Sequence, residues 1–416
     1  MTDQPGRGFW PMRDLPVAGW LLATLVVALV HPVVPAPRWL LIHLLLLGAV
    51  THAILVWSRY FTDALLHTRT APEDRRLQNR RLSLLAVGVL LVVGGVLGDV
   101  WAATLTGAGL VALAVGWHGL SLFRQLRAAL PSRFGPTVRY YVTAAALLPV
   151  GATIGAILAR GPADPWHDRL VVAHVSLNVL GWIGLTVIGT LLTLWPTMLR
   201  TRIAGGAERA SRTALPVLVI GVVLAAGGAL VDLRLVSTLG LVGYVGGLGL
   251  VARSWVQAAH SRRPESFATY SVTGGMLWLA GCLLALVACF ATAPSWAVTE
   301  ERLSWFTPFL AAGFGAQVLL GALSYLLPVA LGGGGRPVAA ANAVLDRAGL
   351  LRVVVVNTGL LVCVLPVPAA ARVLCATVVL VALASFLPLL VLAIRASHTV
   401  RRATPATPGD TRRANT

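Results

Sequence analysis

The residues of this sequence best suited to chemistry are histidines that lie within long apolar stretches. Of the nine histidines, four fall inside such stretches: His43, His52, His118 and His174. A neutral imidazole is the commonest metal ligand in proteins, and an apolar environment disfavours its protonated form. The pattern suits metal ligation within a bundle of apolar helices, but a hydrogen-bonded structural histidine is the alternative, and for His52 and His118 taken singly it is the favoured one.

The stretch HVSLNVLGWIGLTVIGTLLTLWPTMLRTR (174–202) carries small and polar residues along one side of a predicted helix. At about 100° per residue, Asn178 lies about 40° from His174 around the helix, Gly181 about −20° and Gly189 about 60°. One interpretation is a cofactor site, in which the glycines let a flat macrocycle approach the backbone and Asn178 orients a ligand. The other is helix packing, because small residues, His and Asn also occur at ordinary interfaces between membrane helices.

Two of the histidines are predicted to lie at the same depth. With a rise of about 1.5 Å per residue, His43 lies roughly 6 Å into its span and His174 roughly 7.5 Å into its own, both near the outer leaflet. Two imidazoles at one depth on different helices suit the axial ligation of a haem. His43 and His174 are therefore the candidate ligands of the haem iron, with Asn178 and Gly181 beside them. His52 lies about 13.5 Å deeper and half a turn away, so it is a less favoured candidate ligand.

The composition places the whole chain in a membrane. Hydrophobic residues make up 57% of the 416 positions and charged residues only 12%, whereas a soluble protein carries about a quarter charged residues. The mean hydropathy is +0.81. Runs long enough to cross a bilayer recur from end to end, which predicts an all-α polytopic membrane protein. We expect no Asp, Glu or Arg well inside any span.

Twelve spans are predicted, joined by loops too short to hold a soluble domain. They are residues 17–34, 39–58, 82–98, 100–122, 138–159, 170–195, 213–231, 235–252, 268–292, 306–330, 350–367 and 371–394. The expected organisation is a cytoplasmic N-terminal segment (1–16), a twelve-helix membrane domain (17–395) and a disordered, basic cytoplasmic tail (396–416).

The arginines predict the orientation. All 33 basic residues are arginine, and 27 of them fall at the two termini and in or beside the even-numbered loops. Cytoplasmic loops carry the excess of positive charge, so we expect a multi-pass protein of the plasma membrane with both termini in the cytoplasm. The same distribution explains the net charge of +18 without a nucleic-acid partner. The lipid bilayer is the expected partner of these loops.

Two spans share a spacing. The frame G-x7-G-x6-P occurs at 181–196 and again at 313–328. It could record an internal duplication, or arise by chance in a chain with 42 glycines.

Three stretches together carry a resemblance to a known family. They are HLLLLGAVTHAILVWSRYF (43–61), the stretch 174–202 quoted above, and GFGAQVLLGALSYLLPVALGGG (313–334). The chain is similar, over most of residues 15–395, to the membrane module of actinobacterial copper oxidases and copper nitrite reductase-like proteins. More distantly it resembles NnrS-type haem–copper membrane proteins and haem–copper oxidase subunit I. The resemblance implies a haem–copper oxidase-like bundle in which His43 and His174 bind haem b, with copper as a further possible cofactor.

The sequence also departs from that family. The residues directly before Gly313 read WFTPFLAA (305–312) and hold no histidine, where an oxidase-like centre would have one, and no Cys-His copper motif follows residue 395. The implied role is a redox-associated membrane subunit that is not catalytic alone. It would pass electrons to a separate periplasmic cupredoxin or copper oxidase, or sense copper or nitric oxide. Two other functions stay open: a permease for a small solute, whose helices would rock against one another, and a non-catalytic scaffold.

Overall fold

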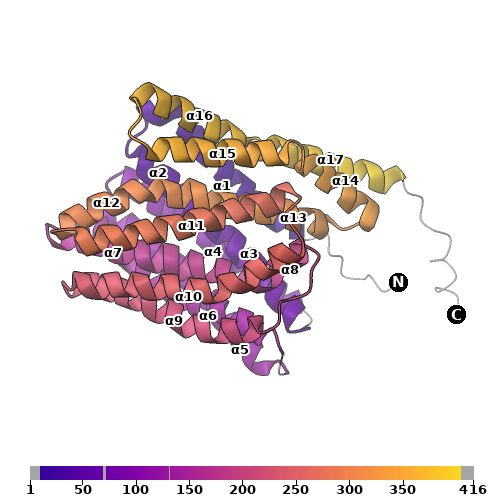
Figure 1. Ribbon diagram of the computed structural model, residues 1–416, viewed down its shortest axis with the longest axis horizontal. Coiled ribbons are helices and arrows are strands. Elements are labelled where there is room, and N and C mark those ends of the chain that lie inside the picture. The colour runs from indigo at the N-terminus through magenta and orange to yellow at the C-terminus, as the bar shows by residue number, and fades with distance from the viewer. Residues whose placement is uncertain (1–9, 69–71, 131, 404–416) are drawn as a thin grey trace. The chain divides into compact units, whose positions relative to one another are not determined.

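The structure is a computed structural model, and it describes residues 10–68, 72–130 and 132–403 (Figure 1). Every regular element in this part of the chain is a helix, and twelve helical spans are long and apolar enough to cross a membrane. The predicted all-α fold with twelve spans is therefore confirmed. The chain is a polytopic membrane protein.

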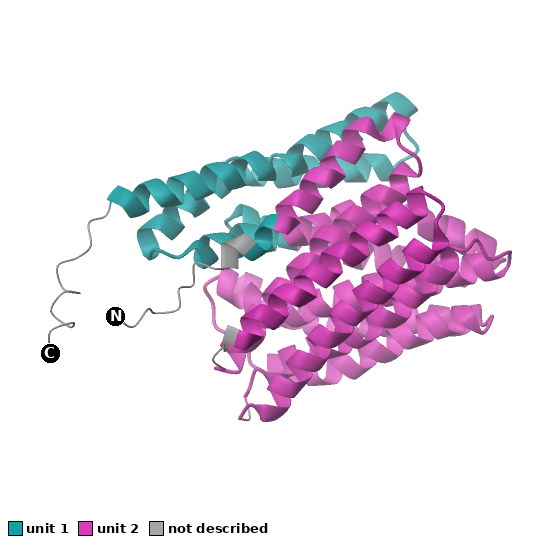
Figure 2. Ribbon diagram, turned by 180° about the vertical axis from the view of Figure 1, so that it is seen from behind, with its two compact units in different colours: residues 1–15, 265–272, 320–416 teal, residues 16–264, 273–319 magenta. Residues whose placement is uncertain are grey.

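Two compact units make up the structure, and each is described by itself (Figure 2). The smaller unit comprises residues 1–15, 265–272 and 320–416, and the larger unit comprises residues 16–264 and 273–319. The single membrane domain predicted for 17–395 thus contains parts of both units.

The helices that lie wholly or mostly in the larger unit are α1 (Trp10–Val30), η2 (His31–Val33), α2 (Pro37–His43), η3 (Leu44–Val50), α3 (Thr51–Leu65), α4 (Pro72–Leu97), α5 (Trp101–Ala128), α6 (Gly135–Leu158), α7 (Trp166–Val175), η4 (Ser176–Gly184), α8 (Leu185–Met198), α9 (Ala207–Leu230), α10 (Arg234–Ser261), α11 (Phe267–Thr292), α12 (Trp296–Pro308) and η5 (Phe309–Ala316). Those that lie wholly or mostly in the smaller unit are α13 (Gln317–Leu331), α14 (Gly335–Leu345), α15 (Gly349–Val364), α16 (Ala369–Ala384) and α17 (Phe386–Ala403).

Small residues bring neighbouring helices of the larger unit close together. α4 packs along α5, and a Cβ added to Gly107 would lie 2.6 Å from the carbonyl oxygen of Gly88. α9 packs along α10 in the same way, and a Cβ on Gly221 would lie 2.8 Å from the carbonyl oxygen of Gly240. Helix association in lipid depends on such close contact, because lipid is as apolar as the side chains it would replace.

Three of the spans contain a π-helical segment in their interior. These segments are η3, η4 and η5, and the spans that hold them are the three most buried of the twelve. π-Helical turns are rare in proteins, and those that occur are often found at functional sites. η4 and η5 fall on the two copies of the G-x7-G-x6-P frame, so the shared spacing corresponds to a shared local structure. An internal duplication stays a prediction.

Two of the π-helical segments are joined by a hydrogen bond at the start of α3. The hydroxyl of Thr51 donates to the carbonyl oxygen of Leu46 (2.9 Å), five residues earlier in η3. The same hydroxyl accepts from the indole Nε1–H of Trp182 in η4 (3.0 Å). η5 reaches η3 as well, since a Cβ on Gly315 would lie 2.8 Å from Leu46 Cδ2.

The helices extend beyond the predicted membrane domain at both ends. α1 begins at Trp10, and α17 continues to Ala403. The expectation of disorder from residue 396 is therefore wrong for 396–403, where Arg401 and Arg402 occupy the last helical turn and suit its partial negative charge. Residues 404–416 of the predicted tail lie outside the described residues.

Two arginines are buried just beyond the ends of the predicted spans 39–58 and 82–98. α3 and α4 continue past their apolar runs, so Arg59 and Arg81 lie inside helices, with only 5% and 1% of their surface exposed. Arg59 is neutralised by Asp63, one turn further on (3.1 Å). Arg81 donates to the side-chain oxygen of Gln78 (3.1 Å). A buried charge is tolerated where it is paired and hydrogen-bonded.

Candidate functional site

A cavity with a volume of about 610 Å³ lies within the larger unit. Its wall comes from α2, η3, the first residue of α3, α4, α5, α6, α7, η4, α12 and η5, so all three spans with π-helical segments reach it. Most of the lining side chains are apolar. The volume falls in the range of about 300–1,000 Å³ that is typical of sites for small ligands and cofactors.

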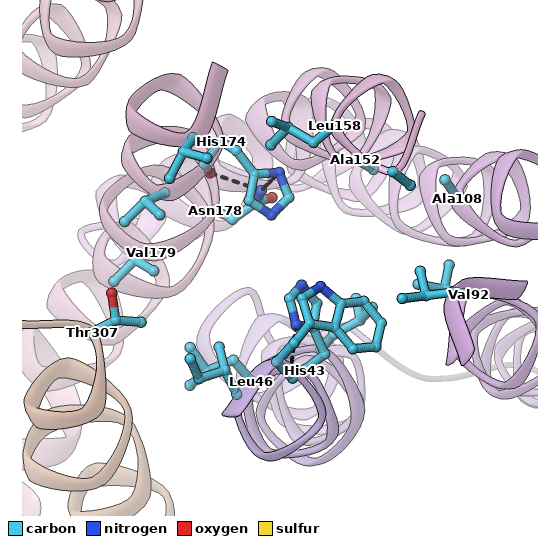
Figure 3. A pocket seen from close by; sticks show the side chains of 18 of the residues that line it. His43, Leu46, Val92, Ala108, Ala152, Leu158, His174, Asn178, Val179 and Thr307 are labelled. Carbon is cyan, nitrogen blue, oxygen red and sulfur yellow. Dashed lines mark hydrogen bonds between the residues drawn. The ribbon is translucent and has the colours of Figure 1, made fainter. Parts of the chain in front are cut away.

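The structure brings His43 and His174 together in this cavity. Their ring centroids are 6.3 Å apart and their ring planes are inclined by 28°. Figure 3 shows the two rings on opposite sides of the cavity, with Asn178 beside His174. The two residues that the rise per residue placed at equal depth therefore have their imidazole rings close together in the structure.

Each of these imidazoles is held by its Nδ1 atom. Nδ1 of His43 lies 2.8 Å from the carbonyl oxygen of Trp39, and Nδ1 of His174 lies 2.9 Å from the carbonyl oxygen of Gly151. A carbonyl oxygen can only accept, so both Nδ1 atoms carry the proton and donate it. Both Nε2 atoms are then bare acceptors, and neither has a hydrogen-bond partner among the described residues. A metal-binding histidine has this same arrangement, with one nitrogen donating to a carbonyl and the other free.

Asn178 supports His174 from the next turn of the same helix. Its Nδ2 donates to the carbonyl oxygen of His174 (2.9 Å) and lies 3.2 Å from the Nδ1 of that residue. Because Nδ1 already donates to Gly151, the shorter contact with the carbonyl oxygen is the hydrogen bond. Asn178 therefore positions the ligand helix and places an amide dipole beside the imidazole.

Two glycines of α6 make room for these side chains, and sequence reasoning missed both. A Cβ on Gly155 would lie 2.7 Å from Cε1 of His174, and a Cβ on Gly151 would clash with the side-chain amide of Asn178. The two glycines are four residues apart and face the same neighbour. That small-xxx-small spacing is the signal that could have found them.

Trp39 contacts the site as well, although its place at a span end predicts only an interfacial anchor. Its ring stacks on His43, with centroids 4.0 Å apart and planes inclined by 21°. Because its carbonyl also accepts the Nδ1 proton, Trp39 fixes both the tilt and the tautomer of His43. The four-residue spacing on one helix face is the signal for this contact.

The other predicted residues lie elsewhere. Gly181 does not line the cavity: a Cβ there would lie 2.9 Å from Leu147 Cδ1, so this glycine serves the packing of η4 against α6. Gly189 of α8 packs against Tyr140 of α6. His52 is buried but is not among the cavity residues. His167 does line the cavity, in the first turn of α7.

Among the described residues, three histidines line the cavity, and the structure records a ring contact between two of them, His43 and His174. Among the described residues, no group of three or more His, Cys, Asp or Glu side chains is arranged to hold a metal ion. The site therefore suits an ion whose remaining ligands come with it, as the pyrrole nitrogens of a haem do. It suits a free ion held by protein alone less well.

No protein-family model matches the chain, and a search of curated proteins finds no match. The resemblance to copper oxidase membrane modules and to NnrS-type proteins thus stays a prediction from the quoted stretches.

Proposed function

We propose that the cavity holds a haem b with His43 and His174 as its axial ligands, and that the protein transfers electrons in the membrane. The observation that carries the proposal is a pair of imidazoles that line one largely apolar cavity, with ring centroids 6.3 Å apart and no hydrogen-bond partner for either Nε2 among the described residues. The bound iron would supply one-electron redox chemistry.

The separation of the rings favours a single ion between them. A bond of about 2.0–2.1 Å from a metal to an imidazole nitrogen puts the ring centroid roughly 3 Å from the metal, so two rings on opposite sides of one ion have centroids about 6 Å apart. The measured separation is 6.3 Å.

Ligation of the iron by both His43 and His174 would favour electron transfer over sensing. A haem iron that binds nitric oxide or another small ligand needs an open position on one face, whereas an electron carrier does not. His43 and His174 are each held by a backbone carbonyl, so neither is free to swing aside without losing a hydrogen bond. We therefore place the chain with electron carriers and assign it no catalysis of its own.

The partner in this proposal is a periplasmic copper protein. His43 ends α2 and His174 lies in the third turn of α7, so both are close to the same end of their spans. From the arginine distribution we infer that this end lies at the outer face of the plasma membrane, with both termini inside. Electrons would leave from that face to a separate cupredoxin or copper oxidase, as the family resemblance implies.

Absorption spectroscopy tests this proposal directly. The full chain, expressed with ample haem precursor and purified in detergent, should show a Soret band and the sharp reduced bands of a low-spin haem. A pyridine haemochrome assay should identify haem b at one per chain. Carbon monoxide should leave the reduced spectrum unchanged, because both axial positions are filled.

Two results would overturn the proposal in different ways. Protein that shows no Soret band leaves the histidine pair as a packing contact and returns the chain to the permease or scaffold alternatives. A haem spectrum that shifts fully with carbon monoxide would reject ligation by both histidines and restore the sensing alternative.

A further inference from the structure

Two of the four cysteines lie on the two helices of a hairpin in the smaller unit, one on each. α15 and α16 pack side by side and are joined by the short turn at residues 365–368. Cys363 lies in the last turn of α15 and is 8% exposed, whereas Cys375, in the second turn of α16, is more exposed. By contrast, Cys282 and Cys289 share one helix, α11.

The contacts between the helices set the register of this pair. Sγ of Cys363 lies 3.7 Å from the carbonyl oxygen of Arg372, three residues before Cys375. One turn below Cys363, a Cβ on Gly359 would lie 3.4 Å from the carbonyl oxygen of Cys375 and 2.5 Å from Val379 Cγ2. The backbones are therefore close at this level, and Cys375 lies within a turn of Cys363 on the facing side.

The directions of the side chains bring the sulfurs closer still. In a helix each Cα–Cβ bond tilts toward the N-terminus. Cys363 therefore leans away from the hairpin turn, down α15, while Cys375 leans up α16 toward the turn. Because Cys375 lies farther from the turn than Cys363, the two side chains lean toward each other.

We propose that Cys363 and Cys375 are an oxidisable pair that forms a reversible disulfide between α15 and α16. The orientation predicted from the arginines puts the turn on the outer side of the membrane, where disulfides form and persist. This inference is independent of the haem site.

An external disulfide is the oxidant in the proposed reaction, which is thiol–disulfide exchange. The more exposed Cys375, as its thiolate, attacks one sulfur of that disulfide, and the other sulfur leaves as a thiolate. The thiolate of Cys363 then attacks Cys375 Sγ and displaces the second thiolate of the oxidant. The pair loses two electrons and two protons, and the external disulfide becomes two thiols.

Peptide mapping of the full-length protein tests the proposal. Reduced protein in detergent is incubated with oxidised glutathione, blocked with an alkylating reagent under denaturing conditions, and cut after arginine. Cleavage after Arg352, Arg372 and Arg395 separates the two cysteines into peptides 353–372 and 373–395. We expect most of these peptides to be recovered as one disulfide-linked species from monomeric protein, and as separate peptides after reduction.

The variants supply matched controls. Cys282 and Cys289 are seven residues apart on one helix, a rise of about 10 Å, which a disulfide cannot span, so Cys282→Ser should leave the linked species unchanged. Cys363→Ser should abolish it and leave Cys375 as a mixed disulfide with glutathione. The proposal fails if wild-type protein yields only separate peptides after oxidation, or if the link joins two chains.

Discussion

His174 and His118 are both histidines of the larger unit, yet their rings have different surroundings. His174 lines the cavity and donates its Nδ1 proton to Gly151, and its Nε2 has no hydrogen-bond partner among the described residues. His118 has both nitrogens engaged: Nε2 lies 2.8 Å from the hydroxyl of Ser58, and Nδ1 lies 3.5 Å from Nη1 of Arg81. A guanidinium can only donate, so Nδ1 of His118 must accept and its Nε2 must donate.

The difference separates a candidate ligand from a structural histidine. The Ser58 hydroxyl accepts a hydrogen bond from His118 and donates one to the backbone carbonyl oxygen of Ile54 (2.6 Å). This polar network joins α3, α4 and α5 through the hydrogen bonds of Ser58 and of both His118 nitrogens, which help to hold the helices in one arrangement. At the cavity the polar atoms hold only one side of each ring. The other side is left for a ligand.

The largest expected effect comes from removing a ligand. His174→Ala or His43→Ala should abolish or strongly shift the haem spectrum, because each removes an axial nitrogen. Both variants should still insert and purify, since the imidazoles face a cavity. Haem occupancy and the Soret band measure the effect. An unchanged spectrum in either variant would show that its imidazole is not a ligand.

His118→Ala is the matched control. It removes a buried imidazole of the same unit, and the wild-type haem spectrum should persist. If His118→Ala abolished the spectrum as fully as His174→Ala, the contrast between a ligand and a structural histidine would fail.

Depth could be predicted from the sequence because it depends only on the rise per residue and on the arginine count. Those two quantities placed His43 and His174 at one level, and the structure joins them in one cavity. Angular position could not be predicted as well. Residues 176–184 are π-helical and wind fewer degrees per residue than an α-helix. Gly181 has therefore rotated out of line, while Asn178, only four residues from His174, has not.

Partners on other helices were also beyond the sequence. Gly151 and Gly155 accommodate Asn178 and His174, yet nothing in the periodicity of α6 states which helix lies next to it. The burial of Arg81 could not be predicted either. Because only apolar runs were counted as spans, Arg81 was assigned to a loop. A helix that continues past its apolar run can bury a charge when a neighbour supplies hydrogen bonds.

The second-largest expected effect is a loss of stability when the hydrogen bond between His118 and Ser58 is removed. His118→Ala leaves a void and removes the partner of Ser58, so it should lower the free energy of unfolding by about 2–4 kcal/mol. Ser58→Ala should cost less, about 1–2 kcal/mol, because it deletes a hydrogen bond and little volume. Denaturant unfolding in detergent measures both. A loss for Ser58→Ala as large as that for His118→Ala would contradict this division.

A third prediction tests the room that α6 leaves for the ligand. In Gly155→Ala the added Cβ would lie 2.7 Å from Cε1 of His174, so the ring must shift. We expect part of the haem to become high-spin and to react with carbon monoxide, while total haem falls by less than half. Gly109→Ala on α5 is the control, because a Cβ there has no atom within 4 Å.

The smallest effect is expected from Asn178→Leu, which keeps both proposed ligands. The amide Nδ2 of Asn178 lies 3.2 Å from Nδ1 of His174 and donates to the carbonyl oxygen of that residue. Its N–H dipole places partial positive charge beside the imidazole, which disfavours the oxidised iron. Leucine removes that charge, so the midpoint potential should fall while haem occupancy stays near wild type. One hydrogen bond in a membrane contributes about 0.5–1.5 kcal/mol. For a one-electron couple, a tenfold change in the equilibrium constant corresponds to about 59 mV. The midpoint potential should therefore fall by on the order of 20–60 mV. Redox titration against the wild-type protein measures it. An unchanged potential would make Asn178 a packing residue of η4, whereas loss of the haem would make it essential to the site.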